Sequence, residues 1–215
     1  MKQLIIIGAG GFGREVLGYA LDMIEAGTAT WKIAGFIDDN LQALDNYDMQ
    51  YRVLDTISNH VITQDFVYIC AIGDTAVKKS ICERFKKHGA KFINIIHPSV
   101  RLGRANVIGI GNVLCPNAVL TENVTIKDFV FLNCHTNCGH DSVVEKYATI
   151  SVFCDITGYV KVDEGAFLGS HASVCPGLTV GAYSKIGAGA CVISDIPEGV
   201  TAVGVPARVV KHHGD

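Results

Sequence analysis

The stretch that decides the fold is "VTIKDFVFLNCHTNCGHDSVVEKYATI", residues 124–150. Within it, Ile126, Leu132, Cys138, Val144 and Ile150 recur at every sixth position. A period of six matches neither the 3.6-residue turn of an α-helix nor the two-residue alternation of an ordinary strand. It is typical of a parallel β-helix, in which each hexad forms one side of a coil and aliphatic side chains stack in the interior.

The same step of six extends far beyond this stretch in both directions. Every member except Cys138 is a branched aliphatic residue, which argues against coincidence. Three hexads make one coil of 18 residues, so residues 18 apart should stack at about 4.8 Å, the spacing of neighbouring strands. The pattern therefore predicts about five coils. Its members are Leu102, Ile108, Leu114, Leu120, Ile126, Leu132, Cys138, Val144, Ile150, Ile156, Val162, Leu168, Val174, Val180, Ile186 and Val192.

The first half of the chain has a different pattern, in which apolar strands alternate with amphipathic helices. Strands are expected at residues 3–9, 32–39, 66–74 and 91–96, and helices at 11–27 and 75–90. Such an alternation builds a parallel sheet with helices on its faces. We therefore predict two domains: a Rossmann-like α/β domain over residues 1–96 and an all-β, β-helical domain over residues 97–215.

The composition narrows the function classes. The formal net charge is only −3, and no basic patch of the kind that binds nucleic acid stands out. No apolar run approaches the ~20 residues that span a bilayer. The first residues are too short and too rich in glycine for a signal peptide. The eight cysteines are scattered without CxxC pairs, so we expect free thiols and a cytoplasmic protein.

A glycine motif follows the first predicted strand. Gly8, Gly10 and Gly13 have the spacing of a dinucleotide fingerprint, whose glycines let a helix start approach phosphates. An NAD-dependent reaction is the weaker interpretation, because a domain ending near residue 96 holds only about half of a full dinucleotide fold. The other interpretations are a loop that holds a different phosphate and a turn without any ligand.

Two sets of motifs carry a resemblance to known proteins. The hexads and the closing "VGVPARVV" (residues 203–210) resemble the left-handed β-helix acyltransferases. With "GAGGFGREV" (8–16), "FIDD" (36–39) and "AIGD" (71–74) in front, the whole chain resembles the bacterial nucleotide-sugar acetyltransferases. That family includes N-acetyltransferases that act on UDP-, dTDP- or GDP-linked 4-amino-deoxysugars, and sialic-acid O-acetyltransferases. The resemblance implies left-handed coils, acetyl-CoA as co-substrate, and a homotrimer with its active sites between neighbouring β-helices.

The catalytic candidates follow from this resemblance. His140 and Asp141 match the family's general base and the acidic residue that follows it. An amine loses a proton as it attacks a thioester, and imidazole is the side chain suited to accept it near neutral pH. A carboxylate beside the imidazole can fix its tautomer. Asp141 matches the family, and Glu122, which lies 18 residues before His140, is the alternative.

The coil arithmetic adds a third candidate. Gly158 lies 18 residues after His140 and should stack on it. Its amide could stabilise an oxyanion, an effect of a few kcal/mol. The family also places a glycine at the acetyl carbonyl in this position. Where some relatives carry a second His, this chain has Thr149, which becomes a candidate cofactor contact.

Further binding residues are implied by the resemblance. Ser170 and Ala188 match positions that touch the pantetheine arm of acetyl-CoA, or they are simply small corner residues. The N-terminal domain would hold the nucleotide of the acceptor. The residues expected there are Gly10, Gly11, Phe12, Asp38, Asp39 and Gly73.

Other residues near His140 have competing interpretations. Cys134, His135, Cys138 and His140 are metal-ligand types, but Cys138 occupies an interior position and should point away from its neighbours, so we predict no metal. His135 should stack with Phe153 and His171 at steps of 18. Apolar residues expected to point outward would suit a contact between subunits: Val130, Phe131, Phe153 and Phe167.

Together these features predict an acetyl-CoA-dependent N-acetyltransferase that modifies a nucleotide-linked amino sugar for bacterial glycan synthesis. Two alternatives remain open. One is O-acetylation of a sugar such as sialic acid by the same residues. The other is a β-helical scaffold that binds a nucleotide sugar without catalysis, against which the adjacent His140 and Asp141 argue.

Overall fold

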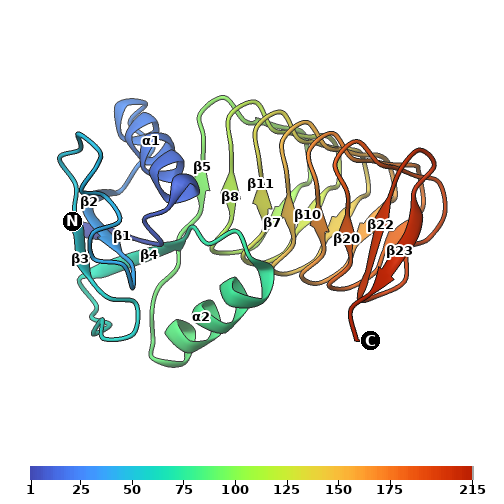
Figure 1. Ribbon diagram of the computed structural model, residues 1–215. Helices are drawn as coiled ribbons and strands as arrows, with labels where there is room; N and C mark the ends of the chain where they lie inside the picture. The colour runs from blue at the N-terminus through green and yellow to red at the C-terminus, as the bar shows by residue number, and fades with distance from the viewer. Residues whose placement is uncertain (215) are drawn as a thin grey trace. The chain divides into compact units, whose positions relative to one another are not determined.

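A computed structural model describes residues 1–214 of the chain. It contains two compact units, Met1–Pro98 and a second unit that begins at Ser99. Figure 1 shows the two kinds of architecture, a small α/β unit and a row of stacked coils. The predicted fold class, a Rossmann-like parallel sheet followed by a parallel β-helix, is confirmed.

The first unit is built on a four-stranded parallel sheet. Its strands are β1 (Lys2–Ile7), β2 (Trp31–Ile37), β3 (Val53–Asp55) and β4 (Phe66–Cys70), in the order β3-β2-β1-β4. The last four residues of β1 are fully buried, as expected of a parallel strand covered on both faces. The short edge strand β3 has no marked apolar run, and the sequence pattern did not predict it.

Two helices accompany this sheet. Helix α1 (Gly11–Glu25) follows β1, and α2 (Thr75–Lys87) follows β4. The Asp74 side chain caps α2 by accepting a hydrogen bond from the Val77 amide at 2.9 Å. The strand predicted over residues 91–96 is mostly wrong. Phe92 makes only an isolated bridge to Tyr68, and β5 is confined to Ile95–Ile96.

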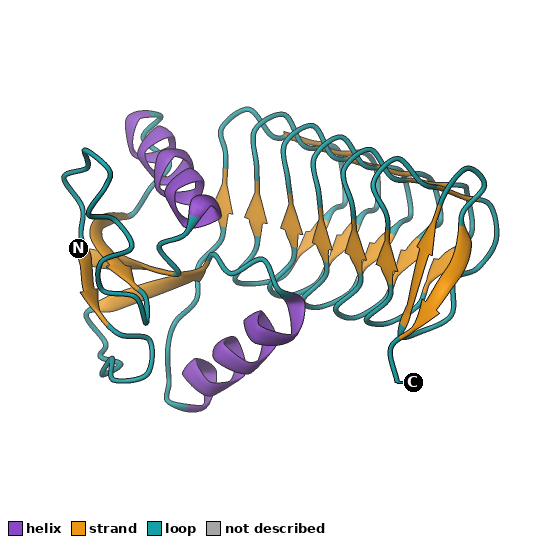
Figure 2. Cartoon of the chain, viewed as in Figure 1, coloured by secondary structure: helices purple, strands orange, loops and turns teal. Residues whose placement is uncertain are grey.

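The second unit is a parallel β-helix with three faces, drawn as rows of short arrows in Figure 2. Each strand pairs with the strand 18 residues away, for example Cys138 with both Leu120 and Ile156. The coils end in β22 (Val200–Val203), which pairs antiparallel with β23 (Arg208–His212). The strands of the coils are β6 (Arg101–Leu102), β7 (Val107–Ile108), β8 (Val113–Leu114), β9 (Val119–Leu120), β10 (Thr125–Ile126), β11 (Phe131–Leu132), β12 (Asn137–Cys138), β13 (Val143–Val144), β14 (Thr149–Ile150), β15 (Asp155–Ile156), β16 (Lys161–Val162), β17 (Phe167–Leu168), β18 (Ser173–Val174), β19 (Thr179–Val180), β20 (Lys185–Ile186) and β21 (Cys191–Val192).

The second residue of every coil strand is the one predicted to point inward. From Leu114 to Val192 these side chains are buried, Cys138 among them, so the predicted interior is confirmed over that span. Burying one such aliphatic side chain stabilises the fold by about 1.5–3 kcal/mol. Leu102 is 45% exposed and Ile108 is half-buried, because no complete coil precedes them.

The corners between faces have a fixed backbone conformation. The third residue after each interior position from Leu102 to Ile186 has a positive φ, as at Asn117, His135, Asp141 and Tyr159. This left-handed conformation is easy for Gly, Asn and Asp and costly for bulky residues. We call the turns after β6, β9, β12, β15, β18 and β21 the His140 corner, and those after β8, β11, β14, β17 and β20 the His135 corner.

The predicted outward apolar surface is wrong for two of its four residues. Val130 and Phe131 are buried within the chain, at 0% and 1% exposure. Val130 lies two residues before an interior position and belongs to the packed coil, and the Phe131 ring is likewise covered. Phe153 is 49% exposed and Phe167 is half-buried. These residues therefore give little support to a subunit contact.

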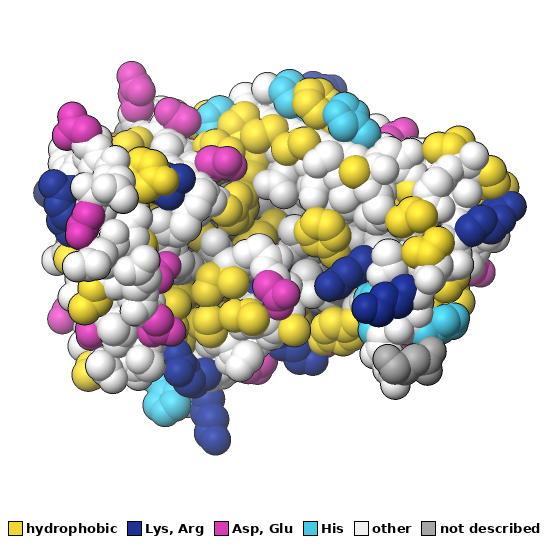
Figure 3. Space-filling model, viewed as in Figure 1, with side chains coloured by type: hydrophobic (Ala, Val, Ile, Leu, Met, Phe, Trp, Pro, Cys, Tyr) yellow, Lys and Arg dark blue, Asp and Glu magenta, His cyan; other side chains and the backbone are white. Residues whose placement is uncertain are grey.

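Within residues 1–214, no helix is long and apolar enough to cross a membrane. All eight cysteines lie in the described part of the chain and are free thiols. On the face shown in Figure 3, the described Lys and Arg side chains are scattered among other types and form no continuous basic surface.

Candidate active site

The centre of the site is the pair His140 and Asp141, in the turn that follows β12. His140 is the second residue after the interior Cys138, and Asp141 takes the left-handed corner position with a φ of 60°. This geometry brings the His140 Nδ1 to 2.8 Å from the Asp141 Oδ2. The His140 side chain is 56% exposed, so a substrate can reach its imidazole.

Asp141 is held by more than its histidine. Its Oδ1 accepts a hydrogen bond from the Asn123 side-chain amide at 3.3 Å, and its backbone amide donates to the Glu122 carbonyl at 3.0 Å. The hydrogen bond from His140 is the largest cause that lowers the pKa of the Asp141 carboxyl below 3.8, and the Asn123 and Tyr159 side chains add to it. Asp141 is therefore a stable anion beside the imidazole.

Glu122, the alternative partner of His140, is engaged elsewhere. Its Oε2 accepts a hydrogen bond from the Arg104 backbone amide at 2.8 Å, one coil away on the side opposite His140. The carboxylate that contacts His140 is that of Asp141.

Gly158 lies directly against the His140 ring. A Cβ on Gly158 would come within 2.7 Å of Nε2 and 2.8 Å of Cε1 of His140. Among the described residues, the Gly158 amide donates no hydrogen bond, whereas its carbonyl accepts one from Gly177 at 3.0 Å. A free backbone N–H thus lies beside an exposed imidazole, which is the arrangement that a general base and an oxyanion donor require.

The glycine motif of the first unit divides into structural and open positions. Gly8 has a φ of 101°, and a Cβ on Gly13 would overlap the Gly8 carbonyl oxygen, so these two glycines are needed for the packing of α1 on β1. A Cβ on Gly10 or Gly73 would meet nothing within 4 Å, and one on Gly11 would touch only the Arg14 guanidinium at 3.9 Å. The open glycines leave room for a ligand.

The two predicted carboxylates of this unit hold loops together. Asp38 Oδ2 accepts a hydrogen bond from the Ala9 amide at 2.7 Å, which ties the glycine loop to the end of β2. Asp39 Oδ1 accepts from the Ser58 amide at 3.2 Å. Phe12 is half-buried in the first turn of α1.

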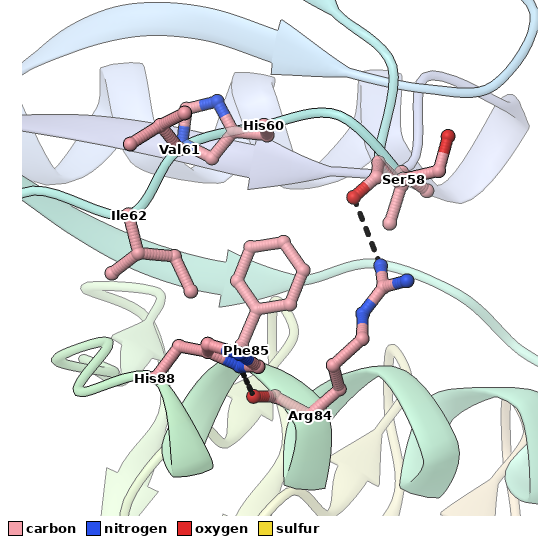
Figure 4. A pocket seen from close by; sticks show the side chains of 8 residues that line it. Ser58, His60, Val61, Ile62, Arg84, Phe85 and His88 are labelled. Carbon is pink, nitrogen blue, oxygen red and sulfur yellow. Dashed lines mark hydrogen bonds between the residues drawn. The ribbon is translucent and has the colours of Figure 1, made fainter.

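A hollow of about 360 Å³ in the first unit is lined by Ser58, which donates to Asp39, but not by Asp39, Asp38 or Phe12 themselves. Figure 4 shows it between the segment from Ser58 to Ile62 and α2, with the Arg84 guanidinium donating to the Ile57 carbonyl at 2.9 Å. None of the predicted acceptor residues lines this hollow.

Comparisons with known proteins agree with this architecture. Residues 3–85 match the family described as the PglD N-terminal domain. The chain is 28% identical over 214 residues to the GDP-perosamine N-acetyltransferase of Escherichia coli O157:H7, covering 96% of this chain and 95% of that protein.

Solved structures extend the likeness to both units. The acetyltransferase domain of PglB from Neisseria gonorrhoeae FA1090 has a TM-score of 0.88 and 29% identity, covering 98% of this chain and all of that domain. PerB from Caulobacter crescentus, solved with CoA and GDP-perosamine, has a TM-score of 0.84 and 26% identity, covering 98% of each chain. In both sequence and fold the chain is similar to hexapeptide-repeat nucleotide-sugar acetyltransferases. The prediction of an acyltransferase is confirmed. This finding argues against the alternative hypothesis of a non-catalytic scaffold.

Not all of the predicted site residues of this acetyltransferase lie together. Ser170 and Ala188 follow β17 and β20 and belong to the His135 corner, one face away from His140. Thr149 is only 4% exposed. In one chain these three are separate from the His140 pair, and their contact with a cofactor stays a prediction.

The predicted aromatic column is confirmed at the His135 corner. The His135 and Phe153 rings stack with centroids 4.7 Å apart, and Phe153 and His171 with centroids 5.0 Å apart. Cys138 is buried inside the coil, and His140 belongs to a different corner from His135. The residues of metal-ligand type near His140 therefore do not lie together. Among the described residues, no group of three or more His, Cys, Asp or Glu side chains could hold a metal ion.

Sequence reasoning missed two residues that contact the His140–Asp141 pair, Asn123 and Tyr159. Tyr159 is 64% exposed, and its ring meets the His140 ring edge to face with centroids 5.0 Å apart. Asn123 and Tyr159 lie 18 residues on either side of Asp141, so the same arithmetic that found Gly158 could have found them.

Proposed function

We propose that this protein transfers the acetyl group of acetyl-CoA to the amino group of a nucleotide-linked 4-amino-deoxysugar, in the synthesis of a bacterial glycan, with His140 as the general base. The observation that carries the proposal is the exposed imidazole between Asp141 and Gly158. Because Nδ1 is paired with Asp141, Nε2 is the ring nitrogen left for a substrate.

The chemistry assigns one role to each residue. The amine nitrogen of the acceptor forms a bond to the thioester carbonyl carbon, and His140 Nε2 accepts the proton that the amine loses. The Gly158 amide donates to the carbonyl oxygen while that oxygen carries negative charge. The carbon–sulfur bond then breaks, the thiolate takes up a proton, and CoA thiol and the sugar amide leave. Asp141 keeps the imidazole in the tautomer whose Nε2 can accept a proton.

The acceptor class is supported from two directions. The curated relative is a GDP-perosamine N-acetyltransferase, and PerB was solved with GDP-perosamine. In this chain, Gly10 and Gly11 are open at the first turn of α1, where backbone amides and the helix dipole favour a phosphate. The α1 first turn carries no acidic side chain that would repel one. We propose that Gly10, Gly11, Phe12 and Gly73 approach the nucleotide, with Asp38 and Asp39 shaping the loop.

The positions of the predicted acetyl-CoA contacts suggest how copies of the chain associate. His140 and Gly158 lie at one corner, whereas Ser170 and Ala188 lie at the next. Both sets can touch the same acetyl-CoA if the His140 corner of one copy faces the His135 corner of another. A ring of three copies meets this condition for every site at once. We therefore propose a homotrimer with its active sites between β-helices.

O-acetylation of a hydroxyl remains the second candidate, because the same base and amide would serve it. The names of the two full-length relatives above favour an amine, since both refer to perosamine, an amino sugar, as acceptor or ligand.

The test is release of CoA thiol from acetyl-CoA. Wild type, His140→Ala and the control His88→Ala, an exposed histidine at the end of α2, are offered UDP-, dTDP- and GDP-linked 4-amino sugars and free sialic acid. We expect thiol release with one amino sugar, unchanged in His88→Ala and lowered about 100-fold or more in His140→Ala. Acetyl-CoA binding by His140→Ala should persist. Full activity in His140→Ala would refute the assignment of His140 as the general base. Release of CoA thiol with sialic acid alone would establish O-acetylation.

A further inference from the structure

Asp141 lies in the middle of a column of three side chains at the His140 corner. Asn123, Asp141 and Tyr159 occupy the left-handed position of successive coils, with φ values of 59°, 60° and 59°. Parallel pairing with a shift of 18 residues places each directly beside the next. The carboxylate that orients His140 therefore has a neighbour on each side, one coil before it and one coil after it.

Asn123 fixes the carboxylate from one side. Its Nδ2 donates to Asp141 Oδ1 at 3.3 Å, while Asp141 Oδ2 is bound to His140 Nδ1 at 2.8 Å. The two oxygens are thus bound by different partners. Rotation of the carboxylate would break one or both hydrogen bonds, so Asn123 limits the orientations that Asp141 can present to the imidazole.

Tyr159 fixes the imidazole from the other side. The rings of Tyr159 and His140 are perpendicular, at 90°, with centroids 5.0 Å apart, the favoured edge-to-face geometry of aromatic pairs. Gly158 lies against the same imidazole. The ring is therefore bounded by backbone and by an aromatic side chain, and its exposed part is left for the substrate.

The left-handed backbone at position 159 does not explain why a tyrosine occupies it. Asn is common in the left-handed conformation, whereas a bulky residue pays a steric cost there. Elsewhere in the coils, tyrosines in this conformation have a specific partner. The Tyr183 hydroxyl donates to Glu164 at 2.6 Å, and the Tyr147 ring stacks on Phe129 at 5.3 Å. The partner of Tyr159 is the His140–Asp141 pair.

We propose that Asn123 and Tyr159 are positioning residues that hold the His140–Asp141 pair in its reactive geometry from the two adjacent coils. Neither touches the reacting atoms. The inference rests on the proposed function, because it assigns them to the base of that reaction.

The experiment uses variants that keep the left-handed backbone. Tyr159→Asn removes the ring, and Tyr159→Phe keeps it. Asn123→Gly removes the side-chain amide. The matched control is Tyr183→Asn, which makes the same change as Tyr159→Asn at a left-handed position of the third corner, the one that contains neither His140 nor His135. Each variant is assayed for kcat, for the KM of both substrates and for the dependence of kcat on pH.

We expect kcat to fall about tenfold in Asn123→Gly, the equivalent of one charge-assisted hydrogen bond, and by a similar factor in Tyr159→Asn, which removes the ring that bounds the imidazole. The KM of acetyl-CoA should stay within about twofold, since binding contacts are untouched. Tyr159→Phe should recover most of the activity, and Tyr183→Asn should match wild type. A normal kcat and pH profile in both test variants would overturn the proposal.

A second readout does not depend on turnover. Nitrogen chemical shifts of the His140 ring report which nitrogen carries the proton. In wild type we expect one tautomer, protonated at Nδ1, and in Tyr159→Asn or Asn123→Gly a mixture. A single tautomer in both variants would also overturn the proposal. If His140→Ala were fully active, the proposed function would fail, and the ring spectrum would still decide whether the two residues position His140.

Discussion

The imidazole of His140 packs on the backbone of Gly158 so closely that the smallest side chain at Gly158 would come within 2.7 Å of Nε2. Two consequences follow from this contact. Residue 158 has to be glycine for the ring to occupy its place, and the Gly158 amide is positioned beside the nitrogen that would take a proton.

The first prediction concerns this contact. Gly158→Ala should lower kcat about 100-fold, because a displacement of the base by about 1 Å misaligns it with the amine. The measurement is the rate of CoA thiol release, with the melting temperature followed in parallel. Gly18→Ala is the matched control, since a Cβ at Gly18 meets nothing within 4 Å. Equal activity in the two variants would contradict the assigned role.

The second prediction concerns the charge of Asp141. Asp141→Asn keeps the left-handed backbone and the side-chain shape but removes the anion, so we expect kcat to fall about 100-fold. The native hydrogen bonds lower the pKa of this carboxyl below 3.8, so it stays ionised at and above pH 5. Its stabilising effect is present above the unfolded pKa and is lost as the pH falls through the lower folded value.

Protonation of Asp141 should therefore contribute no step to the pH dependence of activity between pH 7 and 5. The measurement is kcat/KM against pH in wild type and in Asp141→Asn. An acidic step in wild type within this interval that is absent in Asp141→Asn would show that Asp141 titrates there.

The third prediction separates the two kinds of glycine in the first unit. Gly13→Ala should destabilise the fold by about 3 kcal/mol or more, because the added methyl group overlaps the Gly8 carbonyl. Gly10→Ala should leave the melting temperature unchanged and raise the KM of the nucleotide sugar. Denaturant unfolding and acceptor kinetics measure the two effects. A stable Gly13→Ala protein would contradict the packing described here.

The fourth prediction concerns Lys78, which is fully buried in α2. Burial is the main cause that lowers the pKa of its ammonium from 10.5 to about 7, against the opposing effects of Cys70, Cys82 and Asp74. Between these values the unfolded chain binds the extra proton, so stability should rise with pH, by up to about 1.4 kcal/mol per pH unit.

Lys78→Met should remove this dependence. The free energy of unfolding, measured by denaturant at several pH values between 7 and 10, should rise less steeply in the variant than in wild type. Parallel curves for the two proteins would show that Lys78 does not titrate in this range.

The β-helix was predictable because one position in six must point into a narrow interior, and only small or aliphatic side chains fit there. The same arithmetic placed Gly158 beside His140 and His135 beside Phe153. It failed for Phe131, whose burial depends on what packs against its face and not on the position of the residue in the hexad. Sequence reasoning also missed β3 (Val53–Asp55), an edge strand of three residues that is too short to show a period.

The glycine fingerprint shows a second limit of prediction from the sequence. Spacing alone does not distinguish Gly13, which packing requires, from Gly10, which packing leaves open. The sequence likewise left Glu122 and Asp141 as alternatives for the partner of His140. The choice depends on side-chain directions, which the corner backbone sets and a residue pattern does not record.

The left-handed corners make the site depend on the count of residues between its members. His140 and Gly158 meet because one whole coil separates them. Duplication or loss of a complete coil toward the C-terminus would lengthen or shorten the protein and leave this meeting intact. A single inserted residue between them would move Gly158 away from the corner and bury a polar position. Natural variation in this segment should therefore consist of substitutions, with length changes confined to loops that leave the coil and return to it.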